Sequence, residues 1–167
     1  MSTQRTLVLL RHAKSGYPPG ITDHDRPLAE RGIREATLAG VWIRNRLPGI
    51  DQVLCSTAVR TRQTYELTAL TAAVSYRDAL YDAVPGTVIE TINAVADDVK
   101  TLLVVGHEPT ISSVAIGLSG APGTDATLIR RVAEKYPTSG IAVLTVPSSW
   151  ADVESGSAAL VDFHVPR

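Results

Sequence analysis

The chain has 167 residues, 44% of them hydrophobic, which is enough for one domain, 1–167, with a substantial core. Sixteen Lys and Arg nearly balance seventeen Asp and Glu, which excludes the broad basic surface that binding to a nucleic-acid backbone requires. The single cysteine, Cys55, excludes an internal disulfide and a thiolate zinc site, and we expect it to be a buried apolar residue.

The hydrophobic segments are short. The apolar stretch at 6–10 is followed at once by Arg11, so it is too short for the core of a signal peptide. The least charged segment, 110–124, is interrupted by Ser, Gly and Pro and falls below the roughly 18 apolar residues of a membrane helix. We therefore expect a soluble cytoplasmic protein without a membrane partner.

The first part of the chain predicts two strand–loop–helix units. A leucine-rich, β-branched run leads into a Gly- and Pro-rich stretch, which indicates a buried strand followed by a long loop. Small or apolar residues then recur at helical spacing, with Gly40 as the weakest point of the helix, and Ser56 is the expected cap of the second helix. In chain order the expected elements are a strand at 6–10, a helix at 29–47, a strand at 52–55 and a helix at 58–70.

The second part continues this alternation and ends in two strands. The clearest buried strand of the chain runs directly into Gly106 and His107, and a hydroxyl cap at Thr110 is expected to open the next helix. A turn-rich segment at 147–156 separates the last two strands, as in a hairpin. In chain order the expected elements are a strand at 74–76, a helix at 87–95, a strand at 101–105, helices at 110–118 and 128–135, and strands at 141–146 and 158–164.

The alternation of strands and helices favours an α/β fold. It predicts a three-layer α/β/α sandwich with a mostly parallel central sheet and an antiparallel contribution from the C-terminal pair of strands. No repeat, low-complexity segment or linker divides the sequence, which is consistent with one domain.

Reactive residues follow three of the expected strands: Arg11 and His12 the first, Ser56 and Arg60 the second, and His107 the strand at 101–105. Taken alone, a histidine after a strand is more often a satisfied hydrogen-bonding residue, and an arginine on a helix is more often solvated. Ligands of open α/β sheets, however, bind beyond the carboxyl ends of the strands. If the three strands are parallel, two arginines and two histidines meet in one crevice. Because paired guanidiniums bind phosphoryl groups well, this composition predicts a phosphate site.

Four motifs in this order resemble the histidine phosphatase superfamily, which also contains the cofactor-dependent phosphoglycerate mutases. They are Arg11-His12-Ala13, Asp25-Arg26-Pro27-Leu28 with Arg31-Gly32, Ser56-Thr57-Ala58-Val59-Arg60-Thr61-Arg62-Gln63-Thr64, and Val105-Gly106-His107-Glu108-Pro109. The short length, the form of Arg11 to Ser15 and the segment Lys135-Tyr136-Pro137-Thr138-Ser139-Gly140 resemble the small SixA-like phosphohistidine phosphatase branch. The likeness runs from about Leu7 to the C-terminus and implies a phosphoglycerate-mutase-like fold.

The resemblance implies that His12 is the nucleophile and that Arg11, Arg60 and His107 complete the phosphate pocket. His12 must be neutral to attack, and a backbone carbonyl that accepts from one ring nitrogen would fix its tautomer. His107 is the opposite case, because a bound dianion favours its protonated form, which can donate to a non-bridging oxygen. No clustered carboxylates or Walker-type loop is present, so we expect no metal and no other cofactor.

The sequence offers two candidates for the general acid and two for a further contact with the phosphate. Asp82 is the first candidate for the acid and Glu108 the second, each against the alternative of a solvated carboxylate. Without an acid, the leaving group must depart easily, as an imidazole does. Ser15 and Lys14 are near enough in sequence to His12 to contact the phosphate, but the alternative that each is an exposed loop residue explains them equally well.

Other polar residues have structural interpretations. We expect Asp25 to accept from the backbone of the loop, and Arg26 or Arg31 to brace it. His24 and His164 lie outside the catalytic motifs and are expected to be ordinary. The segments 16–24 and 120–126 are expected to form the rim of an open site.

The leading hypothesis is a phosphatase that acts on a phosphorylated substrate, in particular a phosphohistidine-carrying protein. A broad phosphomonoesterase for small metabolites shares the same first step and differs only at the rim of the pocket. A non-catalytic phospho-binding module on the same fold is the alternative of a different class. Both histidines and both arginines argue against that module, because binding alone needs no nucleophile.

Overall fold

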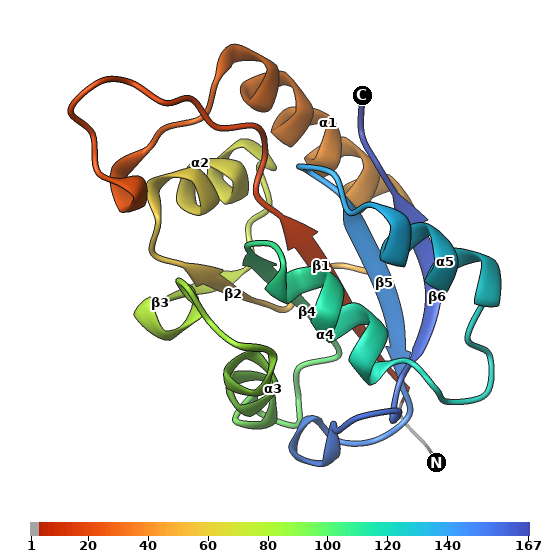
Figure 1. The fold of residues 1–167 in the computed structure, drawn as a ribbon. Helices are drawn as coiled ribbons and strands as arrows, with labels where there is room; N and C mark the ends of the chain where they lie inside the picture. Colours follow the sequence, from red (N-terminus) through yellow and green to blue (C-terminus); the bar gives the residue numbers. More distant parts are fainter. Residues whose placement is uncertain (1–3) are drawn as a thin grey trace.

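A six-stranded sheet forms the centre of the computed structural model, which describes residues 4–167 (Figure 1). The strands lie in the order β3-β2-β4-β1-β5-β6. Their bounds are β1 Arg5–Arg11, β2 Gln52–Ser56, β3 Ala73–Arg77, β4 Thr101–Gly106, β5 Ile141–Val146 and β6 Ala159–His164. Each of the six expected strands is therefore confirmed, with bounds within about two residues of the expected ones.

The directions of the strands also agree with the sequence. Strands β3, β2, β4 and β1 pair in parallel, whereas β5 pairs antiparallel with both β1 and β6. The parallel set comes from strand–helix–strand connections, which return each new strand in the same direction. The antiparallel pair is the C-terminal hairpin expected from the turn-rich segment at 147–156.

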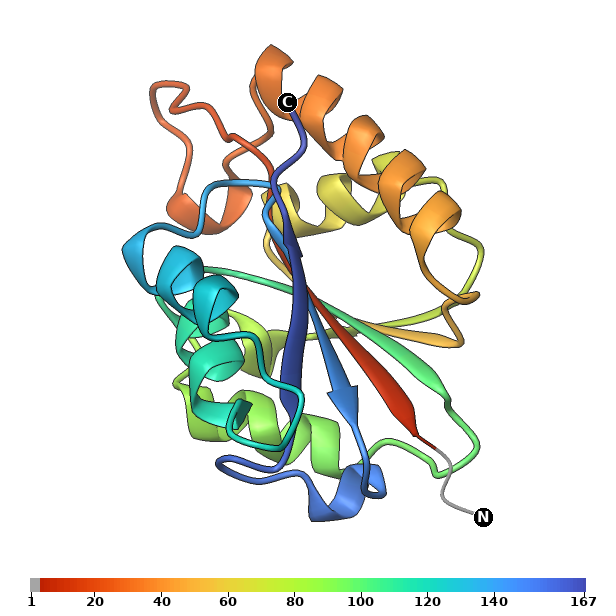
Figure 2. The ribbon, with the colours of Figure 1, turned by 90° about the vertical axis from the view of Figure 1, so that its right-hand side faces the viewer.

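Helices cover both faces of the sheet, which makes the three-layer sandwich. Figure 2 shows α1 and α2 on one face and α3, α4 and α5 on the other. The helices are α1 Glu30–Arg46, α2 Val59–Leu67, α3 Pro85–Asn93, α4 Thr110–Leu118 and α5 Ala126–Glu134, with short 3-10 turns η1 Asp23–Asp25, η2 Asp78–Leu80 and η3 Trp150–Asp152. Within residues 4–167, none of the helices has the length and apolar character needed to cross a membrane.

Strand β1 feeds two separate cores, because side chains alternate between the faces of a strand. Leu7 and Leu9 pack in the core beneath α3, α4 and α5, and Val8 and Leu10 pack in the core beneath α1 and α2. All four are 0% exposed. Burial on both faces explains why the first strand is a continuous apolar run. Cys55 is buried in the second of these cores, as expected.

Two glycines let helix α1 approach its neighbours closely. A Cβ on Gly40 would lie 2.2 Å from the carbonyl oxygen of Thr68, and one on Gly32 would lie 2.1 Å from the carbonyl oxygen of Lys14. The weak point expected at Gly40 is thus a packing contact with the chain beyond α2. Gly32 sets the start of α1 against the backbone just after His12.

Three local expectations are wrong. Helix α2 stops at Leu67 rather than at 70, because Ala69 takes a left-handed backbone with φ of 56°. The residues that precede α2 and α4 are Ala58 and Pro109, and neither helix has a side-chain cap from its expected hydroxyl. The Thr110 hydroxyl donates instead to the carbonyl oxygen of Ala83.

The segment 120–126 is not part of the rim. The amides of Gly120 and Ala121 donate to the carbonyl oxygen of Ala158, which precedes β6. The start of β6 pairs with Thr145, and Thr145 in turn pairs with Thr6 near the start of β1. The segment therefore lies at the end of the sheet opposite to His12.

Candidate active site

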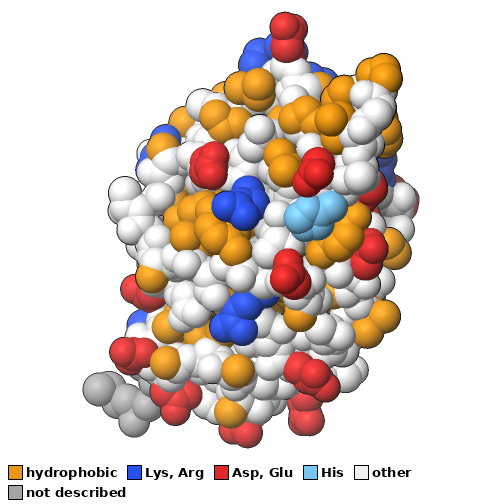
Figure 3. Space-filling view, turned by 90° about the vertical axis from the view of Figure 1, so that its left-hand side faces the viewer, with side chains coloured by type: hydrophobic (Ala, Val, Ile, Leu, Met, Phe, Trp, Pro, Cys, Tyr) orange, Lys and Arg blue, Asp and Glu red, His pale blue; other side chains and the backbone are white. Residues whose placement is uncertain are grey.

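Three parallel strands end at the same level and bring the expected residues together. Arg11 of β1 pairs with Gly106 of β4, and Cys55 of β2 pairs with Val105 of β4. The residues that follow these ends are therefore neighbours. The centroids of the His12 and His107 rings are 5.3 Å apart. Figure 3 shows the molecule from the side of β3 and the loop at 16–25, where a histidine reaches the surface among charged side chains.

His12 is held as a neutral ring with a defined tautomer. It is 7% exposed, and its Nδ1 lies 2.7 Å from the carbonyl oxygen of Ala13. Because a carbonyl only accepts, Nδ1 carries the proton and Nε2 keeps its lone pair. Burial lowers the pKa of His12 to about 3, with smaller effects from His107, Arg60 and Arg11 in the same direction. The carbonyl partner expected from the sequence is confirmed.

His107 has a different partner. Its Nε2 lies 2.8 Å from the hydroxyl of Ser56, which can donate or accept. Burial, with the nearby charge of Arg60, lowers the pKa of His107 to about 4, whereas the charge of Asp23 opposes this. The Ser56 hydroxyl, expected to cap a helix, is thus mainly a partner of the second histidine.

Arg60 is fixed by an aspartate that the sequence did not single out. Its Nη1 donates to the backbone oxygen of Asp23 at 2.7 Å, and its Nη2 donates to Oδ2 of the same residue at 3.1 Å. Asp23 also accepts from the hydroxyl of Tyr81 at 2.5 Å and from Nε of Arg26 at 3.1 Å. The hydrogen bond from Tyr81, aided by those from Arg26 and Arg60, holds the pKa of Asp23 well below its usual range.

Arg11 is anchored by the segment 135–140. Its Nη1 donates to the carbonyl oxygen of Tyr136 at 2.8 Å, and the amide of Ser139 donates to the carbonyl oxygen of His12 at 3.1 Å. Burial lowers the pKa of Arg11, and the charge of Glu108 opposes this. The segment 135–140, rather than 120–126, forms this wall of the site.

Three buried nitrogens of the site lack a hydrogen-bond partner within residues 4–167. They are Nε of Arg11, Nε of Arg60 and Nδ1 of His107. Buried polar nitrogens are costly to leave unpaired, at about 1–3 kcal/mol each, and the two arginine Nε atoms can only donate, so they indicate a ligand with several acceptor oxygens. A phosphoryl group has this composition.

Ser15 and the motif arginines serve the loop at 16–26. The Ser15 hydroxyl lies 2.6 Å from Nη1 of Arg26, so its contact with substrate stays a prediction. Arg26 braces the loop, as expected, but Arg31 pairs with Glu35 on α1. The expected backbone contact of Asp25 is not seen, because its Oδ2 accepts from the Thr22 hydroxyl.

The two remaining histidines have local partners. Nε2 of His24 lies 3.0 Å from the Thr57 hydroxyl, and its ring packs edge-on against Tyr81. His24 is therefore on the rim of the site rather than in a featureless loop. His164 stacks on Trp42 near the end of the chain, in agreement with a structural role.

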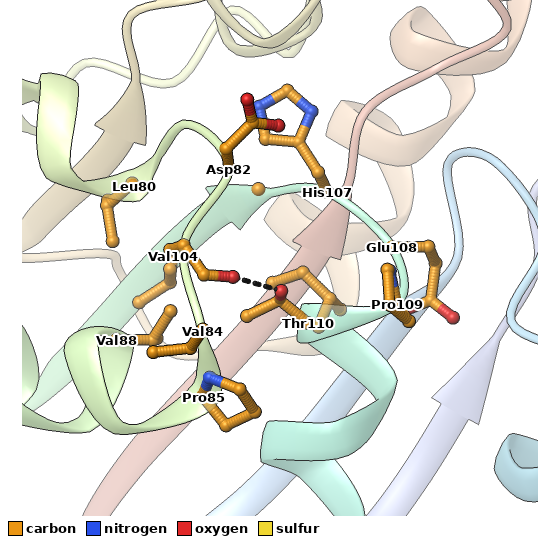
Figure 4. Close-up of a pocket in the computed structure, with 13 residues that line it drawn as sticks. Leu80, Asp82, Val84, Pro85, Val88, Val104, His107, Glu108, Pro109 and Thr110 are labelled. Carbon is orange, nitrogen blue, oxygen red and sulfur yellow. Dashed lines mark hydrogen bonds between the residues drawn. The ribbon is translucent and has the colours of Figure 1, made fainter.

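The two candidate acids differ in their surroundings. Asp82 is exposed, has a left-handed backbone with φ of 53°, and lines a cavity together with His107 (Figure 4). Glu108 points away from His107 and accepts from the amide and hydroxyl of Ser112 at the start of α4. Of the two, Asp82 is the one whose carboxylate lies on the same side as the His107 ring (Figure 4).

The fold and this cluster define a class of α/β protein with an anion pocket built from two histidines and two arginines. The chain belongs to the histidine phosphatase superfamily (branch 1), whose family model matches residues 7–90. It is therefore a phosphatase, a hydrolase that acts on phosphoryl groups.

Known relatives agree with this placement. The uncharacterized protein Rv1276c of Mycobacterium tuberculosis is 65% identical over 158 residues, which cover 95% of this chain and 100% of that protein. A structure from Nakamurella multipartitia, designated phosphohistidine phosphatase SixA, is 40% identical with a TM-score of 0.86 and covers 98% of this chain and 96% of its own. A structure from Agrobacterium tumefaciens with the same designation is 32% identical with a TM-score of 0.78, and the match covers 97% of this chain and 99% of its own.

Proposed function

We propose that the chain is a metal-independent phosphohistidine phosphatase in which His12 takes the phosphoryl group and passes it to water. The observation that carries this proposal is the 2.7 Å contact between His12 Nδ1 and the carbonyl oxygen of Ala13. The Nδ1 proton is bound to the Ala13 carbonyl, so the free lone pair is on Nε2, in a pocket with three unpartnered nitrogens. A neutral, oriented imidazole is the form of histidine that acts as a nucleophile.

In the first step, the lone pair of His12 Nε2 attacks phosphorus while the bond to the leaving group breaks. The non-bridging oxygens accept from the arginines, which balance the charge that develops. Asp23 holds one edge of the Arg60 guanidinium through Nη1 and Nη2, which leaves the edge that carries Nε for the phosphoryl group. His107 is proposed to donate to a further oxygen once the dianion raises its pKa.

In the second step, water attacks the phosphorus of phospho-His12 on the side vacated by the leaving group. The bond from phosphorus to Nε2 breaks, its electron pair returns to His12, and inorganic phosphate is released. Dividing hydrolysis into two displacements lowers the barrier of each.

The substrate class follows from the leaving group. An imidazole that already carries a proton on its other nitrogen leaves phosphorus as a neutral ring and needs no further proton donor, whereas an alkoxide needs one. The designation of the Nakamurella and Agrobacterium proteins as phosphohistidine phosphatases supports the same choice. The second candidate is a small-molecule phosphomonoesterase, and the observation that favours it is Asp82 beside His107, where a carboxyl group would act as general acid.

The proposal is tested by rates measured side by side, without added metal, on a phosphohistidine-carrying protein and on a panel of sugar and nucleotide phosphates. We expect the phosphoprotein to be preferred by about a hundredfold or more, which is about 2.7 kcal/mol of transition-state discrimination. Preference for one small ester would instead support the phosphomonoesterase.

Two controls address the mechanism. His12→Ala should abolish turnover with the circular dichroism spectrum unchanged, and retained activity would end the assignment of His12 as nucleophile. EDTA should leave the rate unchanged. Strong inhibition that added metal reverses would contradict a metal-independent reaction.

A further inference from the structure

A cavity of about 300 Å³ lies beside His107, between the segment that precedes α3 and the start of α4 (Figure 4). Its walls are mainly apolar. The apolar side chains that line it include Val84, Pro85, Val88, Val104 and Ile111.

Two of the four polar side chains that line this cavity are already engaged. The Thr110 hydroxyl donates to the carbonyl oxygen of Ala83, and the Glu108 carboxylate accepts from Ser112. Asp82, by contrast, makes no hydrogen bond or ion pair with the rest of the chain from residue 4 onward. Because Nε2 of His107 contacts the Ser56 hydroxyl, the polar groups that this cavity offers to a ligand are Nδ1 of His107 and the Asp82 carboxylate.

The cavity lies next to the proposed site of phosphoryl transfer, because His107 lines both. Attacking and leaving atoms lie roughly in line across a phosphorus undergoing displacement. His107 lines the cavity, and the centroid of its ring lies 5.3 Å from that of His12, so the cavity adjoins the pocket proposed to hold the phosphoryl group. A leaving group that points to the side of His107 would therefore enter the cavity that Asp82 also lines.

We propose that this cavity binds the imidazole ring of a phosphohistidine and that the Asp82 carboxylate accepts a hydrogen bond from the ring N–H. The inference rests on the proposed function and adds the residues that recognise the leaving group. A flat ring presents C–H edges to the valine, proline and isoleucine walls and one N–H to the single free carboxylate. A sugar would leave hydroxyl groups without hydrogen-bond partners against these walls, which is unfavourable.

The chemistry balances without a proton donor. The ring enters with phosphorus on one nitrogen and a proton on the other. As His12 Nε2 forms its bond to phosphorus, the bond from phosphorus to the ring nitrogen breaks and the electron pair returns to the ring. The ring leaves as neutral imidazole that still carries its N–H. A carboxylate beside the ring favours the protonated ring, which is the better leaving group.

The experiment compares kcat/KM for free phosphohistidine and for phosphoramidate, which has the same phosphorus–nitrogen bond but no ring. Val84→Trp is the test variant, because Val84 lines the cavity and is 64% exposed, so a larger side chain can cover the cavity without displacing the core. We expect the ratio of the two kcat/KM values to fall by about tenfold or more. Val41→Trp is the matched control, because Val41 is 41% exposed on α1, and it should keep the wild-type ratio.

Asp82→Asn provides a second variant that keeps the shape of the side chain and removes its charge. It should also lower the ratio by about tenfold. An unchanged ratio in both variants, or an equal loss on both substrates, would overturn the assignment of the cavity. If the wild-type protein hydrolyses neither substrate, the proposed function itself fails, and the inference fails with it.

Discussion

The two histidines of the site differ in the atoms that hold them. His12 donates to a carbonyl, which fixes one tautomer, whereas His107 contacts a hydroxyl, which tolerates a neutral or a protonated ring. Burial lowers the pKa of both, to about 3 for His12 and about 4 for His107. Both rings are therefore neutral at pH 7 in this structure, and a bound anion has to change the state of His107 for it to act as a donor.

This difference predicts that anion binding takes up a proton. Sulfate is a suitable probe, because it is a dianion that stays unprotonated near pH 7. Its charge should raise the pKa of His107 and bring about one proton per site from the buffer. Isothermal titration calorimetry at pH 7 in buffers of different ionisation enthalpy measures this number directly.

His107→Gln should remove the proton uptake, and His24→Gln should keep it, because His24 lies on the rim against Thr57. Proton uptake that persists in His107→Gln would mean that His12, and not His107, takes up the proton. That result would contradict the division of roles between the two rings.

At the level of elements, the loop at 16–26 depends on one carboxylate. Asp23 accepts from Tyr81 of the segment after η2, from Arg60 of α2 and from Arg26 of the loop itself. By comparison, the backbone of this loop makes few hydrogen bonds, among them that from the Gly16 amide to Pro27. The side chain of Asp23 therefore holds the loop against the pocket.

Removal of this side chain should loosen the loop. In Asp23→Ala, we expect the amides of Gly16, Asp25 and Arg26 to exchange with solvent roughly tenfold faster, because three hydrogen bonds to one charged group are lost. Hydrogen exchange followed by mass spectrometry on peptides from this loop measures the change.

Asp25→Ala is the matched control. Asp25 is two positions away on the same turn, and its carboxylate contacts Thr22 and His24 within the loop. Its removal should leave exchange near the wild-type rate. Equal acceleration in both variants would mean that the turn itself, and not the link to α2 and Tyr81, keeps the loop in place.

The elements show what a single sequence reveals and what it leaves hidden. Strands β1, β2 and β4 are apolar because they are buried on both faces, so their existence and the reactive residues after them could be predicted. Asp23 lies in a polar loop without periodicity, and its partners come from distant segments. The sequence therefore directed attention to Asp25, in the motif, and not to the aspartate two positions earlier.

Ser56 and Gly40 are missed or misread for a related reason. A serine before a helix has the composition of a cap, but the partner of this hydroxyl is a histidine 51 positions later. Gly40 weakens a helix by its intrinsic propensity, but here the absent side chain makes room for Thr68. In both cases a tertiary contact, which local pattern does not encode, decides the role of the residue.

On the scale of the whole molecule, burial of His12 in the pocket makes the free energy of unfolding depend on pH. The unfolded chain exposes every histidine to water, whereas the folded chain buries His12 beside other cationic groups. A histidine with a lowered pKa binds fewer protons in the folded state than in the unfolded state between the two pKa values. The free energy of unfolding therefore rises with pH through that window and falls as the solution becomes acidic.

For His12 the window extends from about 6.5, the ordinary value, down to about 3. The neutral ring therefore contributes its full share of stability above pH 6.5 and loses it as the pH falls, by about 2 kcal/mol at pH 5. The measurement is urea unfolding of the wild type and of His12→Gln, at pH 7.5 and at pH 5, in buffers free of phosphate and sulfate. Because both proteins retain His107, the difference between them isolates the contribution of His12. The wild type should lose about 2 kcal/mol more than the variant over this interval. Equal losses in the two proteins would mean that His12 takes up a proton in the folded state, and its role as a neutral nucleophile would then be untenable at mildly acidic pH.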